Sequence, residues 1–473
     1  MSKNDLLRPP GPENSLPFGL KQVLGMASDP LGFLSRMAQY GDLVRYKAGL
    51  NDVYLVNHPD YAREVLVTQQ RNFVKGQSVA LLKELLGEGV FTGDGAEHLR
   101  RRRMLQPGFH KERLAAFAQI MVDYTTRKQL TWQNRSEIDL TEEMKQLTLA
   151  IVTRTLFDLD VAVDQPELGD ALNALHTWAA RFLLPVPLAR LVNKLPLASN
   201  RKFKAAKLYL DTTMDALVRQ RRAEGLERGD LLSLLLESAE TENVQTGSEG
   251  KLSTSQIREE LLTFFLAGHE TTALALMWAW CLLSQHPAAE AKLHRELENE
   301  LAGGPPNLES LPRLPYTGQV FSEALRLYPP AYAIPRYALR PCRLGGYTIP
   351  SGSLVLVSPY LTHRDPRFYE EPEQFKPERW TPEFKATLPK MAYFPFGGGP
   401  RLCIGESFAM MEGVLVLAIL AQGWQMRLVP SQSLELNPKL TLRPKFPIRM
   451  VLQQRQSGSG LGTVQTESLQ QPV

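Results

Sequence analysis

The chain has 473 residues, of which 43% are hydrophobic and 22% are charged, and its formal net charge is +4. This composition predicts a large globular protein with a substantial core, and the mild charge argues against a dedicated nucleic-acid binder. The three widely spaced cysteines make no disulfide framework, which favours a reducing cytosol. Because no strong linker divides the chain, we expect one large domain.

The two ends of the chain differ in composition from its middle. Residues 1–20 are polar and contain several prolines, and we find in them neither an apolar signal core nor a transmembrane anchor. Residues 453–473 are polar and rich in Gly, Ser and Gln, which predicts a disordered tail. We therefore expect residues 21–452 to form the folded domain.

Helical patterns dominate the middle of the chain. Residues 29–40 predict a helix, and residues 43–46 and 53–56 predict a hairpin because apolar and β-branched residues dominate both segments. Most of residues 111–237 again predicts helices. These patterns indicate a mainly α protein with a small β-rich lobe.

Two segments in the helical part have a different composition. Residues 183–196 are apolar and interrupted by prolines. That composition fits a lid over a substrate channel, a segment that touches a membrane surface, or a simple connection between packed helices. Residues 237–251 are rich in Ser, Thr, Glu and Gly, which predicts a flexible surface loop.

A run of four arginines, residues 100–103, follows His98 on a predicted helix. Four consecutive arginines point in all directions around a helix, so the run fits a solvated basic face, an anion-binding patch or a docking face for an acidic electron donor. His98 and Arg102 are four residues apart and therefore share one helix face. The forked donors of an arginine suit a carboxylate.

A long apolar helix is predicted from Ser253 to Gln285. Ser253 and Gln256 fit a capping box, and Pro287 follows the apolar run. About 32 residues at 1.5 Å each span roughly 48 Å, which is enough to cross a whole domain. Glu270 at the centre argues against a transmembrane span because an ionisable group is costly there.

The centre of this helix carries small and polar residues on one face. Phe264, Ala267, Gly268 and Thr271 have helical spacing, and Glu270 is adjacent. The two small residues leave room for a group to approach the backbone, and the Thr271 hydroxyl can donate a hydrogen bond there. The alternative is a buried helix whose threonine bonds the carbonyl four residues earlier.

Further polar residues stand out between this helix and the C-terminal part. Glu323 and Arg326 are three residues apart on a predicted helix, a spacing that is common for ordinary surface pairs. Residues 347–350 and 353–357 predict short strands, and a final strand is expected to end near residue 452.

A glycine-rich loop with one cysteine, residues 396–405, precedes a last apolar helix. Glycine tolerates the positive φ angles of a tight loop. A helix N-terminus stabilises a thiolate, and a thiolate there suits a soft or redox-active metal, haem iron being one candidate. A small buried hydrophobe is the alternative for Cys403. A nucleophile beside a histidine is disfavoured because the nearest is His363, and zinc is disfavoured because no partner ligands lie close by.

The loop resembles the haem-binding loop of the cytochrome P-450 superfamily. The family pattern Phe-x-x-Gly-x-Arg-x-Cys-x-Gly is matched at all five fixed positions: Phe396, Gly399, Arg401, Cys403 and Gly405. Residues 267–272 resemble the oxygen-binding motif of that family. Glu323 and Arg326, with the Pro-Glu-Arg-Trp segment 377–380, resemble its structural triad. The resemblance implies a single large domain, mainly α with a small β-rich lobe, around haem b, in a soluble bacterial-type member.

The resemblance also assigns roles to residues. Cys403 is implied as the axial ligand of the haem iron, Thr271 as the residue that stabilises bound dioxygen, and Glu270 as part of a proton relay. Implied cofactor-binding residues are His98, Arg102, Arg336 and Arg401 for the propionates, with Phe396, Gly405 and Ala267 around the ring. The implied structural triad is Glu323, Arg326 and Arg379. The residues expected to line the substrate cavity are Phe264, Tyr332, Ala333, Ile334 and Phe446.

The function implied by the resemblance is that of a haem-thiolate monooxygenase. It would use dioxygen and two external electrons to hydroxylate or epoxidise a lipophilic molecule such as a fatty acid, terpenoid, steroid or polyketide. The electrons would come from NAD(P)H through a separate ferredoxin or flavodoxin and its reductase, and the protein would be a cytoplasmic monomer. The alternatives are a haem-thiolate enzyme that uses peroxide or rearranges an oxygenated substrate, and a non-catalytic haem sensor. Intact Glu270 and Thr271 argue against both.

Overall fold

A computed structural model describes residues 8–13, 17–160, 166–179, 181, 186–225, 228–240 and 252–455. The tail expected from residue 453 and the loop expected at 237–251 lie mostly outside these ranges. The proline-interrupted segment 183–196 is described from residue 186, where a helix begins.

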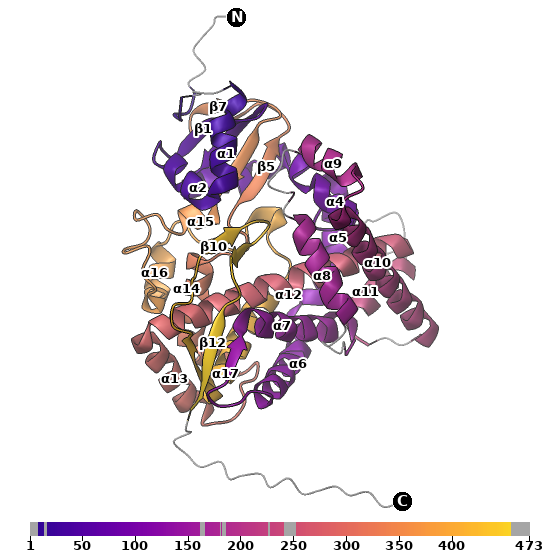
Figure 1. Ribbon diagram of the computed structural model, residues 1–473, viewed down its shortest axis with the longest axis vertical. Coiled ribbons are helices and arrows are strands. Elements are labelled where there is room, and N and C mark those ends of the chain that lie inside the picture. The colour runs from indigo at the N-terminus through magenta and orange to yellow at the C-terminus, as the bar shows by residue number, and fades with distance from the viewer. Residues whose placement is uncertain are drawn as a thin grey trace, which may run out of the picture.

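Helices make up most of the described chain (Figure 1). The α-helices in chain order are α1 Leu20–Ser28, α2 Pro30–Ala38, α3 Pro59–Arg63, α4 Ala80–Leu86, α5 Gly95–Leu105, α6 Lys111–Leu130, α7 Leu140–Phe157, α8 Pro166–Ala179, α9 Val186–Lys194, α10 Ala198–Glu224, α11 Leu231–Glu240, α12 Thr254–Gln285, α13 Pro287–Leu301, α14 Pro315–Leu327, α15 Pro359–Thr362, α16 Pro382–Thr387 and α17 Glu406–Gly423. The predicted fold class, mainly α with a small β-rich lobe, is confirmed.

The strands are short and form small sheets. They are β1 Leu43–Ala48, β2 Asn51–Val56, β3 Phe73–Val74, β4 Glu137–Asp139, β5 Ile334–Ala338, β6 Cys342–Leu344, β7 Tyr347–Ile349, β8 Leu354–Val357, β9 Trp424–Leu428, β10 Leu436–Pro438, β11 Leu442–Pro444 and β12 Arg449–Gln454. The largest sheet has the order β1-β2-β8-β5-β3, with only β2 and β8 parallel. The predicted hairpin is the antiparallel pair β1–β2. Figure 1 shows this sheet beside α1 and α2 at one end of the molecule.

The predicted long helix is α12, which runs through the helical part of the fold. Its capping box is present, because the Ser253 hydroxyl accepts from the Gln256 N–H at 3.2 Å and the Gln256 side chain accepts from the Ser253 N–H at 2.9 Å. All of its residues from Thr272 to Leu283 are buried. Among the described residues, α12 and α17 are long and apolar enough to cross a membrane, but most of each is buried inside the protein.

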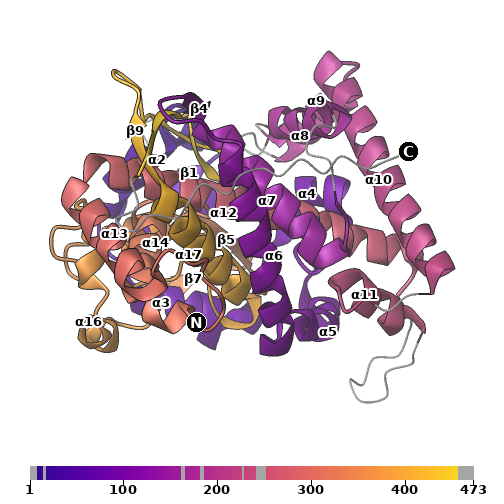
Figure 2. The ribbon, with the colours of Figure 1, turned by 90° about the horizontal axis from the view of Figure 1, so that it is seen from below.

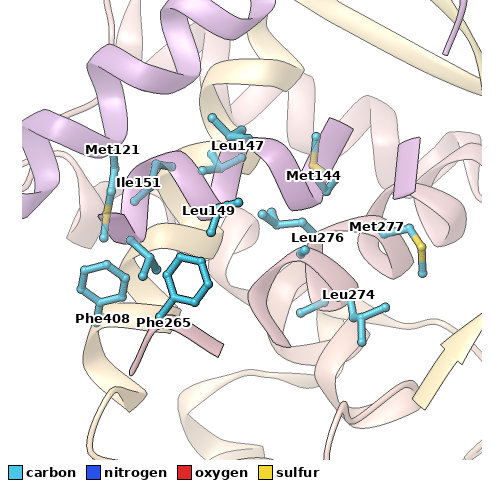
Figure 3. Packing of buried hydrophobic residues seen from close by; sticks show 14 of the residues in the cluster. Met121, Met144, Leu147, Leu149, Ile151, Phe265, Leu274, Leu276, Met277 and Phe408 are labelled. Atoms are coloured by element: carbon cyan, nitrogen blue, oxygen red, sulfur yellow. The ribbon is translucent and has the colours of Figure 1, made fainter. Parts of the chain in front are cut away.

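The core is built where four helices meet. Helix α12 packs against α7, and α17 packs against α6 (Figure 2). Figure 3 shows the side chains at this centre, with Ile151 of α7, Phe265 of α12 and Phe408 of α17 close to one another. A Cβ at Gly413 of α17 would lie 2.1 Å from the Phe321 ring of α14, so a glycine is needed for this close approach.

Candidate active site

The cysteine loop is held by backbone contacts that demand glycine. The Cys403 N–H donates to the Phe396 carbonyl at 3.0 Å. Gly399 has φ +66°, and a Cβ there would lie 2.1 Å from the carbonyl oxygen of Leu66 in the π-helical turn Glu64–Thr68. The predicted tight loop is therefore present, and it is fitted onto a segment more than 300 residues earlier in the chain.

The Cys403 side chain is solvent-accessible, although it lies within the fold. Desolvation raises the pKa of its thiol, while a hydrogen bond from the Gly405 backbone lowers it. The backbone hydrogen bond acts in the direction predicted for a helix N-terminus, but desolvation outweighs it, and Cys403 precedes the N-cap Gly405 by two residues. A metal cation bound to the sulfur would supply the missing positive charge.

The central face of α12 is open at one point. Ala267 is exposed and Thr271 is partly exposed, whereas His269 and Thr272 around them are buried. The Thr271 hydroxyl donates to the Ala267 carbonyl at 3.0 Å, which is the back-bonded arrangement considered from the sequence. A Cβ at Gly268 would lie 3.1 Å from Val152 of α7. The expectation that both small residues provide room on this face is thus wrong for Gly268, which faces α7.

Glu270 is buried and engaged by the C-terminal part of the chain. Its Oε1 accepts a hydrogen bond from the Thr441 hydroxyl at 2.9 Å and forms an ion pair with Arg443. The sequence placed an acid beside Thr271, but it contained no signal for these two partners.

A group of basic side chains, which we call the cation group, gathers near the cysteine loop. Its members are Lys75, His98, Arg336 and Arg401. Desolvation is the main cause that lowers all four pKa values, to about 3 for His98 and to about 10 for Arg336. The positive charges of neighbouring lysine and arginine side chains lower several of these pKa values further.

Asp94 is the carboxylate that acts on this group. It accepts from Arg401 at 2.6 Å and from the Lys75 backbone N–H at 3.3 Å, and it raises the pKa values of Lys75, Arg336 and Arg401. It occupies the N-cap position of α5 but makes no capping bond with its side chain. Lys75 and Asp94 were missed by sequence reasoning because neither belongs to a motif.

Arg102 acts on both the cation group and the cysteine, because its charge lowers the pKa of His98 and, although desolvation lowers the pKa of Arg102 itself, Cys403 acts to raise it. Its guanidinium donates to the Leu402 carbonyl at 2.6 Å, so it contacts the cysteine loop directly. His98 and Arg102 lie close together on α5, as their four-residue spacing predicted. His98 is buried, and the charge of Arg102 lowers the pKa of the His98 imidazole.

These residues fit haem b. The accessible sulfur of Cys403 is a suitable iron ligand, the cation group matches two carboxylates, and Ala267 leaves a small exposed surface on α12. The fit rests on the buried cations Arg336 and Arg401, which Asp94 alone does not balance among the described residues, and on His98, which is neutral near pH 7 and offers a hydrogen-bond donor.

The predicted triad assembles. Both Glu323 oxygens accept from Arg326 at 2.8 Å, and Oε1 also accepts from Arg379 at 3.0 Å. The Trp380 indole and the Lys376 backbone N–H donate to the same carboxylate. Glu323 and Arg326 are completely buried, so this cluster ties α14 to the segment before α16.

The residues predicted to line the substrate cavity are placed in different surroundings. Phe264 is buried, with its ring 5.5 Å from that of Phe109. Tyr332 belongs to the core of the β-rich lobe, and its hydroxyl donates to the Lys439 carbonyl at 2.9 Å. Its expected position along the substrate cavity stays a prediction. Ala333 and Ile334 are partly exposed. Phe446 is 46% exposed, and the Lys445 ammonium lies over its ring.

Fold and site together define a haem-thiolate protein, and comparison with known proteins agrees. Residues 9–451 match the family described as "Cytochrome P450". The chain belongs to the cytochrome P450 family, and it is a monooxygenase that acts on a lipophilic molecule. A solved structure, "Crystal structure of cytochrome P450DA heme domain", superposes with a TM-score of 0.83 at 26% identity, covering 95% of this chain and 98% of that one.

Several similar proteins come from Streptomyces. "Cyclooctatin synthase" of Streptomyces melanosporofaciens is 40% identical, with 92% of this chain and 93% of that protein aligned. "Cyclooctat-9-en-7-ol 5-monooxygenase" of the same organism is 35% identical over 88% and 89% of the two chains. "Pentalenene oxygenase" of Streptomyces avermitilis is 32% identical over 86% and 88%.

Proposed function

We propose that this monooxygenase hydroxylates a terpenoid, and that its substrate is a cyclic hydrocarbon skeleton rather than a fatty acid. The observation that carries this choice is the similarity to oxygenases named for cyclooctat-9-en-7-ol and for pentalenene, each aligned over more than four fifths of its length. The fatty acid, steroid and polyketide classes remain the outcomes that the experiment below separates.

The proposed roles of the residues follow from the donor set. Cys403 holds the iron, and Arg336, Arg401, Arg102 and His98, together with Lys75, hold the two carboxylates. When bound, haem supplies the activation of dioxygen with two external electrons. Phe396 and Gly405 shape the loop around the sulfur.

On the opposite side, Ala267 leaves room beside α12. The Thr271 hydroxyl turns from the Ala267 carbonyl toward the open side and donates a hydrogen bond there, while Glu270 passes protons toward it. Phe264, Ala333, Ile334 and Phe446 contribute to the substrate cavity. Glu323, Arg326 and Arg379 hold the protein around the site without touching the reacting atoms.

The remaining expectations stand as part of the same proposal. Electrons come from NAD(P)H through a ferredoxin or flavodoxin and its reductase, and the protein works as a cytoplasmic monomer. The functional unit is one domain at residues 21–452, flanked by the Pro-rich segment 1–20 and the tail 453–473.

The test is an optical titration of the ferric protein with cyclic terpene alcohols, straight-chain fatty acids and steroids. We expect only the terpenoid series to shift the Soret band toward the high-spin form, since a ligand that fits displaces water from the iron. A shift with fatty acids alone would overturn the substrate proposal. Turnover with NADPH and surrogate redox partners, but not with peroxide alone, separates the monooxygenase from the peroxide-using alternative.

A further inference from the structure

The acid of α12 is held by two residues of the hairpin β10–β11. The Thr441 hydroxyl donates to Glu270 Oε1 at 2.9 Å, and the Arg443 guanidinium forms an ion pair with the same oxygen. Arg443 Nε also donates to the Thr441 hydroxyl at 3.0 Å. Each of the three groups therefore contacts the other two. Glu270 and Thr441 are buried, and the Arg443 side chain is 19% exposed.

The hairpin itself is anchored to the same helix. The Trp278 indole of α12 donates to the Leu442 carbonyl at 3.4 Å, and the Leu442 N–H donates to the Pro330 carbonyl at 3.0 Å. Leu442 lies between Thr441 and Arg443 in sequence, so these bonds determine where both side chains lie relative to Glu270. The Tyr332 hydroxyl, which donates to the Lys439 carbonyl, adds a third attachment.

We infer that Thr441 and Arg443 are positioning residues for Glu270, and that the β10–β11 hairpin directs its carboxylate during proton delivery. The inference rests on the proposed role of Glu270. A cation and a hydroxyl on one oxygen favour the ionised carboxylate, which takes up a proton from a hydronium ion of the solvent and leaves a water molecule behind. The protonated acid loses its charge attraction to Arg443, turns away from it, and gives the proton to the Thr271 side, after which it returns as a carboxylate.

This arrangement differs from a simple surface ion pair. An exposed pair contributes little because both partners are solvated. Here the carboxylate is largely withdrawn from water, so removal of the guanidinium leaves a poorly compensated charge and an undirected side chain. The effect should therefore fall on proton delivery more than on substrate binding.

The test compares Arg443→Met, Arg443→Lys and Thr441→Val with the control Lys445→Met. Lys445 lies two residues from Arg443 and pairs at 2.7 Å with the exposed Glu435, so the control removes the same charge next to the hairpin. We expect Arg443→Met to lower product formed per NADPH oxidised by about tenfold, because misplaced acids lose much of their catalytic effect. The lysine variant should restore most of it, and the control should couple like the natural protein.

Substrate affinity, read from the optical shift, should stay within about twofold in all four variants, since uniform binding is not altered. Equal coupling in Arg443→Met and the natural protein would overturn the inference. If the natural protein itself forms no product, the proposed function fails instead.

A second measurement decides the inference without turnover. Glu270→Gln, Arg443→Met and the double variant are unfolded by heat as purified proteins. Because the two residues are in contact, the double variant should lose less in Tm than the sum of the single losses. Additive losses would show that Arg443 does not hold Glu270, and Thr441→Val repeats the cycle if Arg443→Met fails to fold.

Discussion

Two regions of the molecule bury arginines and use them in opposite ways. In the triad, Arg326 and Arg379 share the carboxylate of Glu323, and backbone carbonyls of residues such as His363 accept the remaining Arg326 donors. In the cation group, Arg336 and Arg401 lie near Lys75 and His98, and their pKa values are lowered. The comparison teaches that the triad places a shared carboxylate and backbone carbonyls on its arginine donors, whereas the cation group has one partly exposed carboxylate, Asp94, and we propose that a ligand supplies the remaining acceptors.

The largest effect is expected from breaking the triad of Glu323, Arg326 and Arg379. Glu323→Gln removes the shared negative charge and leaves Arg326 buried without it, which should cost about 3–5 kcal/mol of unfolding free energy. Urea unfolding of the cofactor-free protein measures this loss. Glu373→Gln is the control because its pair with Arg364 has a 70% exposed carboxylate, and it should cost less than about 0.5 kcal/mol. Equal losses in the two variants would contradict the comparison.

Removing a member of the cation group should change the free energy of unfolding of the cofactor-free protein in the opposite direction. Arg336→Met takes away a buried cation that neighbouring cations repel, so the free energy of unfolding should stay level or rise. Haem release, measured by transfer to an excess of apomyoglobin, should become about 10- to 100-fold faster, because a charged hydrogen bond is worth about 1.5–3 kcal/mol. A cofactor-free variant as unstable as Glu323→Gln would place Arg336 among the structural residues.

His98 makes the unfolding stability of the protein depend on pH. Its folded pKa is about 3, below the usual 6.5, so the unfolded chain binds a proton that the folded protein refuses between these values. Stability should therefore fall as the pH drops below about 6.5. At pH 5 this contribution amounts to at most about 2 kcal/mol, which His98→Asn should remove.

The measurement for His98 is urea unfolding of both cofactor-free proteins at pH 8 and pH 5. His294 and His363 also have lowered pKa values, but they are present in both proteins, so the difference between the proteins isolates His98. If both proteins lose the same free energy of unfolding between pH 8 and pH 5, His98 does not cause the pH dependence and the prediction is wrong.

The smallest effect is expected from Asp94, the carboxylate that pairs with Arg401 of the cation group. Asp94→Asn removes the charge beside Arg401, and because the Asp94 side chain makes no capping bond in α5, the substitution does not disturb the helix cap. The cofactor-free protein should lose about 1 kcal/mol, because Asp94 is partly exposed and its ion pair is partly screened. Thermal unfolding with and without haem provides the check. A larger loss with haem bound would contradict the idea that Asp94 balances the cations before the ligand does.

Local patterns determined much of this protein. The capping box at Ser253, the length of α12 and the hairpin β1–β2 follow from side chains within a few residues of one another, because backbone hydrogen bonds and side-chain periodicity act over that range. The glycines of the cysteine loop also indicate a positive φ by themselves, as Gly399 shows. The pairing of Glu323 with Arg326 belongs to the same class, since three residues make one helical turn.

Only the tertiary structure decided which charges meet and which side chains turn inward. Lys75 and Asp94 reach Arg401 from more than 300 residues away, and Arg443 reaches Glu270 from 173 positions later in the chain. The inward position of Tyr332 and the raised pKa of the Cys403 thiol likewise depend on the segments packed around them. Charge interactions and desolvation depend on distance in space, and a sequence specifies that distance only through the whole fold.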